Sequence, residues 1–365
     1  MKKLLLKILL FSPIGLIMAL TIYWTDPLRN FTKPDNTAQI AEILIAGKFV
    51  NVSNIERRML QKTLIERQKQ APDIAVFGSS RADRFSSMLF PGCILRNNSV
   101  NSGTLEDYVS LTNVYLRRGI LPKTIILELD PWILNENQDI AIYTVLTSEY
   151  QSLAKKAAID ISVEDRIRFE WYRDKKYFNL FSPIFFQQSL RVLILGGKGP
   201  DLIEMEDSAA YLIQGGYAPD GSLSYSTIEV KSAQEVEQAA IQYATKKEIS
   251  FMNNFRRLDP KREVVLERFV DYISSQGSRV VLFLVPFHPT AYKILISRPE
   301  YEIIKQCEEY FRQMAEEHHL SLLGSYNPAS YDISGSEFTD GTHPKMSAIK
   351  KIMGSSALTL CNSPD

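Results

Sequence analysis

Two short stretches of this sequence place residue types that can activate a nucleophile near the ends of apolar segments. In IAVFGSSRADRF (residues 74–85), an apolar run ends at Gly78 and is followed by Ser79 and Ser80. In EFTDGTHPKMSAIKK (residues 337–351), Asp340 and His343 are three residues apart. A hydroxyl, an imidazole and a carboxylate are the groups that cooperate in nucleophilic acyl transfer. The sequence therefore makes acyl transfer through a serine its first candidate chemistry.

Both motifs also have a purely structural interpretation. A serine at a helix start accepts a hydrogen bond from a free backbone N–H, which contributes about 1 kcal/mol. An aspartate three residues before a histidine also occurs in capped surface loops. From residue types alone, Ser79 and Ser80 are equivalent. Of the four histidines, residues 318–319 lie in a charged helix end, which leaves His343 and His288 as candidate bases.

The elements that must position these groups follow from the apolar pattern. Continuous apolar runs, typical of strands buried on both faces, alternate with segments of helical period, which favours a parallel sheet covered by helices. We expect strands at 73–78, 93–100, 124–130, 278–287 and 320–326, and helices at 105–119, 262–277, 300–319 and 346–360. A helix is also expected to begin near Arg81. The two serines would then lie at the carboxyl edge of the sheet, where such folds bind ligands.

The N-terminal segment has the pattern of a membrane anchor. Three lysines precede an uncharged stretch from Ile8 to Trp24, a length near the lower limit for a spanning helix. The basic residues favour a cytoplasmic N-terminus and export of the remainder. We therefore expect an uncleaved anchor at residues 1–25, with a cleaved signal peptide as the alternative, and a helical lead-in at residues 26–72.

The remaining chain, residues 73–365, is expected to form one α/β domain. The alternation of strand and helix patterns is interrupted at about 131–255, and we interpret this segment as an insertion at the active edge of the sheet. Within that insertion, residues 211–230 favour a hairpin or loop around an Asp-Gly turn.

Composition narrows the classes of partner. The chain of 365 residues has 42 basic and 42 acidic residues, so its charge does not favour nucleic acid as a binding partner. Its three cysteines, Cys93, Cys307 and Cys361, have no spacing typical of a metal site and permit at most one intrachain disulfide. No metal or organic cofactor is implied.

Taken together, the two motifs resemble the SGNH (GDSL-like) hydrolase and acyltransferase superfamily, which has a three-layer α/β/α, flavodoxin-like fold. The resemblance covers residues 73–130 and 255–360. The family's first block, Gly-Asp-Ser, corresponds to Gly78-Ser79-Ser80, and its last block, Asp-x-x-His, corresponds to Asp340 through His343. The resemblance therefore selects Ser80 as the nucleophile, with His343 as base and Asp340 as its partner.

The middle sequence blocks of that family supply hydrogen-bond donors to the oxyanion of the reaction intermediate. This sequence resembles those blocks only in part. Gly103, in NNSVNSGTLED (97–107), is similar to the family glycine, so the N–H groups of Ser80 and Gly103 would form a two-donor hole. The family asparagine is replaced by Asp130, and an ionised carboxylate facing an oxyanion would oppose catalysis. We expect Asp130 to pair with Arg81, since both lie at the carboxyl edge; the alternative is a strand-end cap before Pro131.

Other polar and aromatic residues are candidates for the rim of the site. His288, in FLVPFHPTAY (283–292), would contact substrate or serve as a structural residue. Trp132, Tyr217 and Tyr225 would stack on sugar rings or pack within the fold.

The resemblance implies an exported, membrane-anchored serine esterase or O-acyltransferase that acts on a cell-envelope polysaccharide or related polymer. Anchored members of the superfamily often work beside a multi-pass membrane acyltransferase, so the membrane and such an enzyme are the expected partners. The catalytic domain would be periplasmic or extracellular. The rival hypothesis is a non-catalytic envelope-binding or assembly protein that keeps the fold, which the irregular middle block favours.

Overall fold

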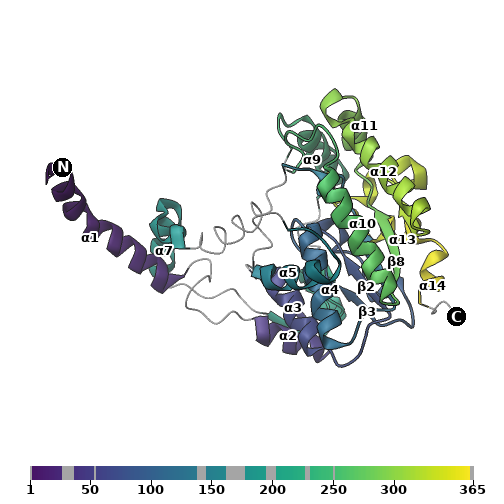
Figure 1. The fold of residues 1–365 in the computed structure, drawn as a ribbon, viewed down its shortest axis with the longest axis horizontal. Coiled ribbons are helices and arrows are strands. Elements are labelled where there is room, and N and C mark those ends of the chain that lie inside the picture. Colours follow the sequence, from purple (N-terminus) through teal and green to yellow (C-terminus); the bar gives the residue numbers. More distant parts are fainter. Residues whose placement is uncertain are drawn as a thin grey trace.

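Five parallel strands form the central sheet of the protein in this computed structural model (Figure 1). They are β2 (Ile74–Phe77), β3 (Leu95–Asn97), β4 (Thr124–Glu128), β8 (Arg279–Leu284) and β9 (Ser321–Gly324), in the order β3-β2-β4-β8-β9. Every neighbouring pair is parallel. The structure describes residues 2–26, 37–52, 55–137, 145–161, 177–194, 203–226, 231–249 and 251–361.

The strand order places a topological switch next to the first serine motif. Counted along the chain, the strands have the order 2-1-3-4-5, and the direction of winding reverses between β2 and β4. Ligands of doubly wound sheets bind at this crevice, outside the carboxyl ends of the strands. All five predicted strands are present, each shorter than its apolar run. The predicted α/β class with a parallel sheet is confirmed.

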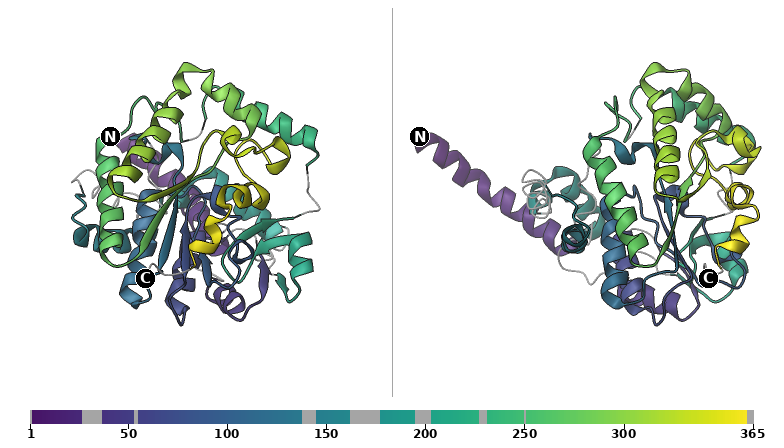
Figure 2. Two further views of the ribbon diagram at one scale, coloured as in Figure 1. Left: turned by 90° about the vertical axis from the view of Figure 1, so that its right-hand side faces the viewer. Right: turned by 45° about the vertical axis from the view of Figure 1, so that its right-hand side comes forward.

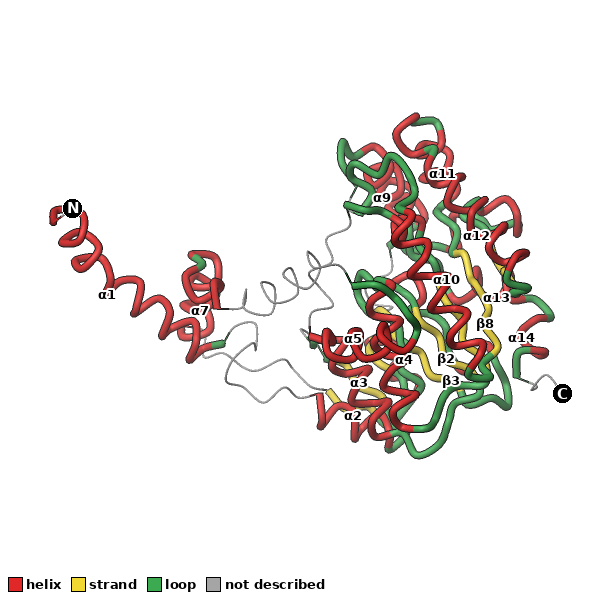
Figure 3. Tube along the Cα trace, viewed as in Figure 1, coloured by secondary structure: helices red, strands yellow, loops and turns green. Residues whose placement is uncertain are grey.

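Helices cover both faces of the sheet, which explains the continuous apolar runs (Figure 3). Ile125 and Leu127 of β4 pack with α4 (Leu105–Arg118), α10 (Pro260–Ser275) and α12 (Ile303–Glu317). Ile126, which points to the opposite face, packs with α13 (Met346–Met353). Because successive strand residues enter different cores, no strand position can be polar without a partner.

The predicted helices are present with small shifts at their ends. Segment 300–319 begins with the 3₁₀ turn η6 (Pro299–Tyr301) before α12, and segment 346–360 divides into α13 and α14 (Ser356–Thr359). The prediction of a helix near Arg81 is wrong: only the 3₁₀ turn η1 (Ser80–Ala82) forms, followed by η2 (Ser87–Leu89). Asp83 follows η1, and its carboxylate is buried against the guanidinium of Arg57.

A second, antiparallel sheet was not predicted. Its order is β5-β1-β6-β7, formed by β1 (Phe49–Asn51), β5 (Ile203–Met205), β6 (Gly215–Tyr217) and β7 (Leu223–Tyr225). The hairpin of β6 and β7 contains the Asp220-Gly221 turn expected there, whereas residues 208–214 form the short helix α8 (Ser208–Gln214).

The lead-in is folded onto the domain. It contains α2 (Thr37–Ile45), β1 and α3 (Arg57–Arg67), and a buried ion pair joins Arg58 of α3 to Asp107 of α4. Residues 27–36 and 53–54 of this predicted segment lie outside the described residues.

The elements of the segment from 131 to 255 pack on different parts of the protein. It begins with η3 (Pro131–Leu134) and contains α5 (Thr147–Lys156), η5 (Asn179–Phe181), α7 (Pro183–Ile194) and α9 (Ala233–Thr245). Of these, α9 packs on α11 (Pro289–Ile296), whereas α7 and η5 pack on α1 (Lys2–Thr25), away from the sheet (Figure 2). The prediction that the whole insertion lies at the active edge is therefore wrong for residues 177–194. Residues 138–144, 162–176, 195–202, 227–230 and 250 lie outside the described residues.

The N-terminal segment is helical, as its apolar character suggests. Across the part of the chain that the structure describes, however, none of the helices combines the length and the apolar character needed to cross a membrane. The expected single-pass anchor is therefore not supported. The 3₁₀ turns η7 (Pro328–Tyr331) and η8 (Gly335–Glu337) lie between β9 and the C-terminal motif.

Candidate active site

The structure brings Ser80, His343 and Asp340 into one chain of hydrogen bonds. Ser80 Oγ lies 2.9 Å from His343 Nε2, although the two residues are 263 positions apart. On the other side of the ring, His343 Nδ1 lies 2.8 Å from Asp340 Oδ2 and 3.0 Å from Oδ1. With Nδ1–H donating to the carboxylate, Nε2 is the nitrogen that can accept the serine proton. The geometry is that of an activated hydroxyl.

The loop that carries Asp340 and His343 is closed by the carboxylate itself. Asp340 Oδ1 accepts from the backbone N–H groups of Thr342 at 2.8 Å and His343 at 2.9 Å. Burial by itself would raise the pKa of Asp340, but the hydrogen bond and charge of His343, with these two N–H donors, hold it well below its usual range. The carboxylate is therefore ionised at neutral pH and stabilises a protonated imidazole.

The two serines have different surroundings. Ser79 is buried, and its Oγ accepts from the backbone N–H of Arg81 at 3.2 Å, so it caps the η1 turn. Ser80 is the first residue of that turn and is partly exposed toward His343. The structural interpretation thus applies to Ser79, and the geometry of a nucleophile applies to Ser80.

Gly103 lies against the turn that carries the serines. A Cβ at this position would stand 2.5 Å from Gly78 O and 3.1 Å from Ser79 N, a contact that no side chain permits. None of the hydrogen bonds found among the described residues uses the N–H of Ser80 or of Gly103. Among the described residues, these two N–H groups therefore have no protein acceptor.

Arg81 and Asp130 form the expected pair. Arg81 Nη1 donates to Asp130 Oδ1 at 2.7 Å, and both side chains are buried. The guanidinium also donates to backbone oxygens at the end of β8, to Val285 at 2.5 Å and Pro286 at 2.9 Å, and to Thr342 at 3.1 Å. Arg81 thus connects the serine turn, the end of β4, the end of β8 and the histidine loop. Asp130 is neutralised by this pairing.

Glu128 is a residue of the site that the sequence did not indicate. It is fully buried in β4, and its Oε2 accepts from the backbone N–H of Ser79 at 2.9 Å. Burial, followed by the nearby charge of Asp130, raises the pKa of Glu128 well above its usual range. Within the described residues, neither Glu128 Oε1 nor Asp130 Oδ2 receives a hydrogen bond from a donor group, and the two carboxyls are in side-chain hydrogen-bond contact.

One proton shared by the two carboxyls satisfies both orphaned oxygens. Two carboxylates at hydrogen-bond distance cannot both ionise in a buried site. Glu128 therefore holds the proton and donates it to Asp130, while its other oxygen orients the serine turn. The only sequence signal was a charged residue inside an apolar strand, in TIILELD (124–130).

Of the remaining candidates, His288, Trp132 and Tyr217 are buried, and Tyr225 is partly exposed. His288 is buried and caps α11, since its Nδ1 accepts from the N–H of Thr290 at 3.2 Å. Burial lowers the pKa of His288, so the ring is neutral. Trp132 and Tyr217 are packed in the fold, whereas Tyr225 is 46% exposed and its hydroxyl donates to Asp83 at 3.1 Å.

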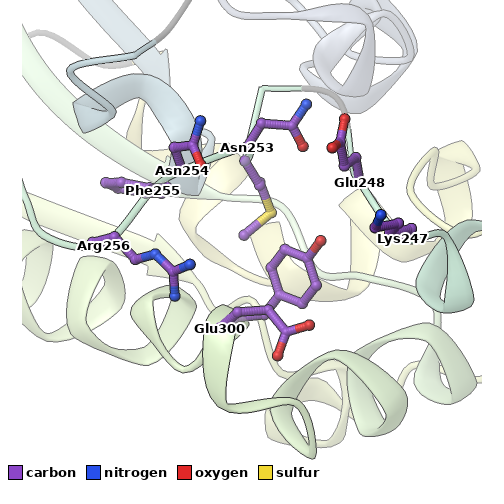
Figure 4. Close-up of a pocket in the computed structure, with 9 residues that line it drawn as sticks. Lys247, Glu248, Asn253, Asn254, Phe255, Arg256 and Glu300 are labelled. Atoms are coloured by element: carbon purple, nitrogen blue, oxygen red, sulfur yellow. The ribbon is translucent and has the colours of Figure 1, made fainter.

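A pocket of about 420 Å³ opens elsewhere on the domain (Figure 4). It is lined by the loop that follows α9, including Asn253 and Arg256, and by Glu300 and Tyr301. The triad is not part of its lining. The pocket is therefore a separate feature.

Comparison with known proteins gives a family. The family model described as "Protein of unknown function (DUF1574)" matches residues 36–354, which include the serine turn, Glu128, Asp130 and the histidine loop. No curated protein matches the chain. Because the match extends over most of the sequence, the chain belongs to the DUF1574 family.

Proposed function

We propose that this protein is a serine-dependent O-acyltransferase or esterase of the SGNH type that acts on a cell-envelope polysaccharide or related polymer. The observation that carries the proposal is the uninterrupted chain from Ser80 Oγ through His343 to Asp340. Two N–H donors and a neutralised acidic pair surround the same turn, as an acyl-transfer site requires.

The proposed reaction uses each of these groups. His343 Nε2 takes the proton of Ser80 Oγ as the oxygen attacks the carbonyl carbon of an acyl ester. The resulting oxyanion accepts from the N–H groups of Ser80 and Gly103. The C–O bond to the leaving alcohol then breaks, and the imidazolium returns its proton to that alcohol, which leaves an acyl-serine. A second hydroxyl, from water or from a sugar, repeats the sequence in reverse.

An extracytoplasmic location is part of the proposal. A disulfide between Cys93 and Cys361 joins the loop before β3 to the C-terminal segment. Structural disulfides persist in oxidising compartments and are rare in the cytosol. A periplasmic or extracellular site would meet envelope polymers directly, and a multi-pass membrane acyltransferase is the proposed donor of the acyl group.

We favour transfer over hydrolysis because of α9. Residues of this helix stand against the histidine loop: a Cβ on Gly341 would lie 3.1 Å from Tyr243 Cβ and 3.2 Å from Ala240 Cα. Residues of α9 can thereby help to position an acceptor hydroxyl near the acyl-serine and raise its effective concentration. An esterase requires only access for water.

Intact-mass analysis tests the chemistry. We expect the protein to gain one acyl mass after exposure to an activated acyl ester, with the adduct on the Ser80 peptide and none in S80A. The matched control S79A should still be acylated. If wild type and S80A gain the same adducts, or neither gains any, the triad does not act and the rival, a non-catalytic envelope-binding protein, is favoured.

A second measurement separates transfer from hydrolysis. With a chromogenic acyl ester, we expect slow release of the chromophore that accelerates when an envelope oligosaccharide is added, together with acylated sugar detected by mass. A fast release of chromophore whose rate does not change with any acceptor, and that leaves no acylated sugar, would instead identify an esterase.

A further inference from the structure

The outward face of α1 is apolar over about half of its circumference. Six large apolar side chains of α1 are exposed by 41% or more, and they lie on the side opposite its contact with η5 and α7: Ile14, Leu16, Ile17, Leu20, Tyr23 and Trp24. The covered side includes Gly15, which meets the ring of Phe181, and Ile22, which is 2% exposed. No residue from Ile8 to Thr25 is charged. A water-facing helix surface is normally polar.

The segment 177–194, which packs on α1, also exposes large apolar side chains. Phe178, Phe181, Ile184, Leu193 and Ile194 are each exposed by 60% or more, and of these the ring of Phe181 also meets Gly15 of α1. On α7 the exposed side chains are mixed in kind. Ile184, Gln187, Gln188 and Arg191 share one strip at helical spacing, and Leu190, Leu193 and Ile194 lie beside it. A helix of this kind suits a boundary between water and an apolar phase.

α1 and α7 pack on each other beside the sheet domain (Figures 1 and 2), and we call their exposed apolar side chains together the α1–α7 surface. Exposed apolar surface of this kind marks a site of interaction with a protein or a membrane. The charges of residues 2–25 and 177–194 are Lys2, Lys3, Lys7 and Arg191, with no carboxylate. Cations without anions beside apolar side chains complement a bilayer that contains anionic lipids.

We propose that the α1–α7 surface is a membrane-contact site that inserts into the interface of an anionic phospholipid bilayer. The exposed apolar side chains of α7 lie among the acyl chains near the headgroups, and its Gln and Arg side chains reach the headgroups. Membrane contact thus involves residues 177–194 as well as the N-terminal helix, and this contact does not require a helix to cross the bilayer. The inference is independent of the triad chemistry.

A bilayer fits this surface better than a protein groove does. A groove covers one stripe of a helix, whereas the exposed apolar residues of α1 extend around about half of it and α7 exposes further apolar residues. A lipid phase covers the whole surface at once. A second copy of the chain is the rival occupant that the test must exclude.

The cysteines of the protein make a site-specific test practical. Cys93 and Cys361 are joined in a disulfide and Cys307 is buried, so one introduced surface cysteine can be labelled selectively without reductant. We choose Leu193→Cys on α7 and, as a matched control, Leu358→Cys on α14, an apolar residue of 66% exposure on the sheet domain. Each full-length variant carries an environment-sensitive fluorophore and is mixed with vesicles of phosphatidylcholine and phosphatidylglycerol.

We expect the label at position 193 to shift to the blue, to gain about twofold or more in intensity, and to be quenched by brominated lipid, because it enters the acyl region. The label at position 358 should not respond. Flotation should show weaker binding to phosphatidylcholine alone, and replacing Leu193 and Ile194 by Glu should reduce binding to mixed vesicles.

Three results would overturn the proposal. The first is vesicle-bound protein whose label at position 193 keeps the emission it has in water. The second is protein that does not float with either vesicle. The third is a blue shift that needs no lipid and grows with protein concentration, which would assign the surface to self-association. Acylation of Ser80, measured on the same samples, shows whether the acyl-transfer proposal stands, whatever the outcome with lipid.

Discussion

Arg81 Nη1 lies 2.7 Å from Asp130 Oδ1, and this buried pair compensates the charge of Asp130 beside the proposed oxyanion site. The guanidinium occupies one carboxylate oxygen and three backbone carbonyls, among them that of Thr342 in the histidine loop. Asp130 cannot then present free charge to a developing oxyanion. The same contact keeps the serine turn and the histidine loop in register, so Arg81 is a positioning residue.

Removing Arg81 should destabilise the protein strongly. Arg81→Ala leaves Asp130 buried without its cation, and we expect the free energy of unfolding to fall by about 3–5 kcal/mol. Asp130→Asn should cost less, because Arg81 keeps its three carbonyl acceptors. Denaturant titration of both variants measures the difference. Equal losses would show that the ion pair is not the main role of Arg81.

Replacing Ser80 should affect turnover far more than replacing Ser79, because the two side chains have different contacts in the structure. Ser80→Ala removes the nucleophile, and we expect ester turnover to fall by about 10³-fold or more. Ser79→Ala removes a cap, so it should lower stability by about 1 kcal/mol and keep much of the turnover. Steady-state kinetics at a temperature where both variants are folded tests this. Comparable loss from both substitutions would contradict the assignment of Ser80.

Glu128 should be replaceable by glutamine but not by alanine. The amide of Glu128→Gln can accept from Ser79 N–H and donate to Asp130, as the protonated carboxyl does, so turnover should change by less than about tenfold. Glu128→Ala leaves the Ser79 N–H without its acceptor and should reduce turnover more than Glu128→Gln does. The comparison needs kcat and KM for both variants and thermal unfolding to show that they are folded. If the glutamine variant is as impaired as the alanine variant, the orienting role is wrong.

The pH dependence of stability gives an independent measure of the shared proton. The pKa of Glu128 is raised in the folded state, so the folded protein binds more protons than the unfolded chain between about 4.5, the ordinary value, and the raised value. Stability from this group is therefore full below pH 4.5 and declines as pH rises through that window. The Glu128→Gln protein has no such proton. We expect urea unfolding to show that, relative to wild type, it gains stability from pH 4.5 upward.

Gly103 should be intolerant of even one methyl group. Its Cβ would stand 2.5 Å from Gly78 O, so Gly103→Ala must move the backbone that presents the N–H donor. Loss of one oxyanion donor typically reduces kcat by about 10²- to 10³-fold. Gly119→Ala is the control, since Gly119 has positive φ but open space around it. That variant should lose about 1 kcal/mol of stability and keep its turnover. Unimpaired turnover in Gly103→Ala would remove Gly103 from the site.

Local pattern in the sequence determined the elements of the sheet domain. The five strands and the four helices were predictable because burial on both faces imposes continuous apolar runs and helical packing imposes its own period. The spacing of Asp340 and His343 likewise predicted their contact, since three residues can close a turn around one carboxylate. These features depend on neighbours in the sequence.

Contacts between distant segments were decided by the tertiary structure alone. The sequence showed Glu128 as an acidic residue in a strand, but the close approach of β2 and β4 places it under the Ser79 N–H. The small sheet and the packing of residues 177–194 on α1 join segments more than 150 residues apart. A periodic apolar pattern indicates that one face of a helix or strand is covered, but it does not identify the segment that covers it. For the same reason, residue types left Ser79 and Ser80 equivalent, and only the folded chain turns Ser79 inward to cap η1 and directs Ser80 to His343.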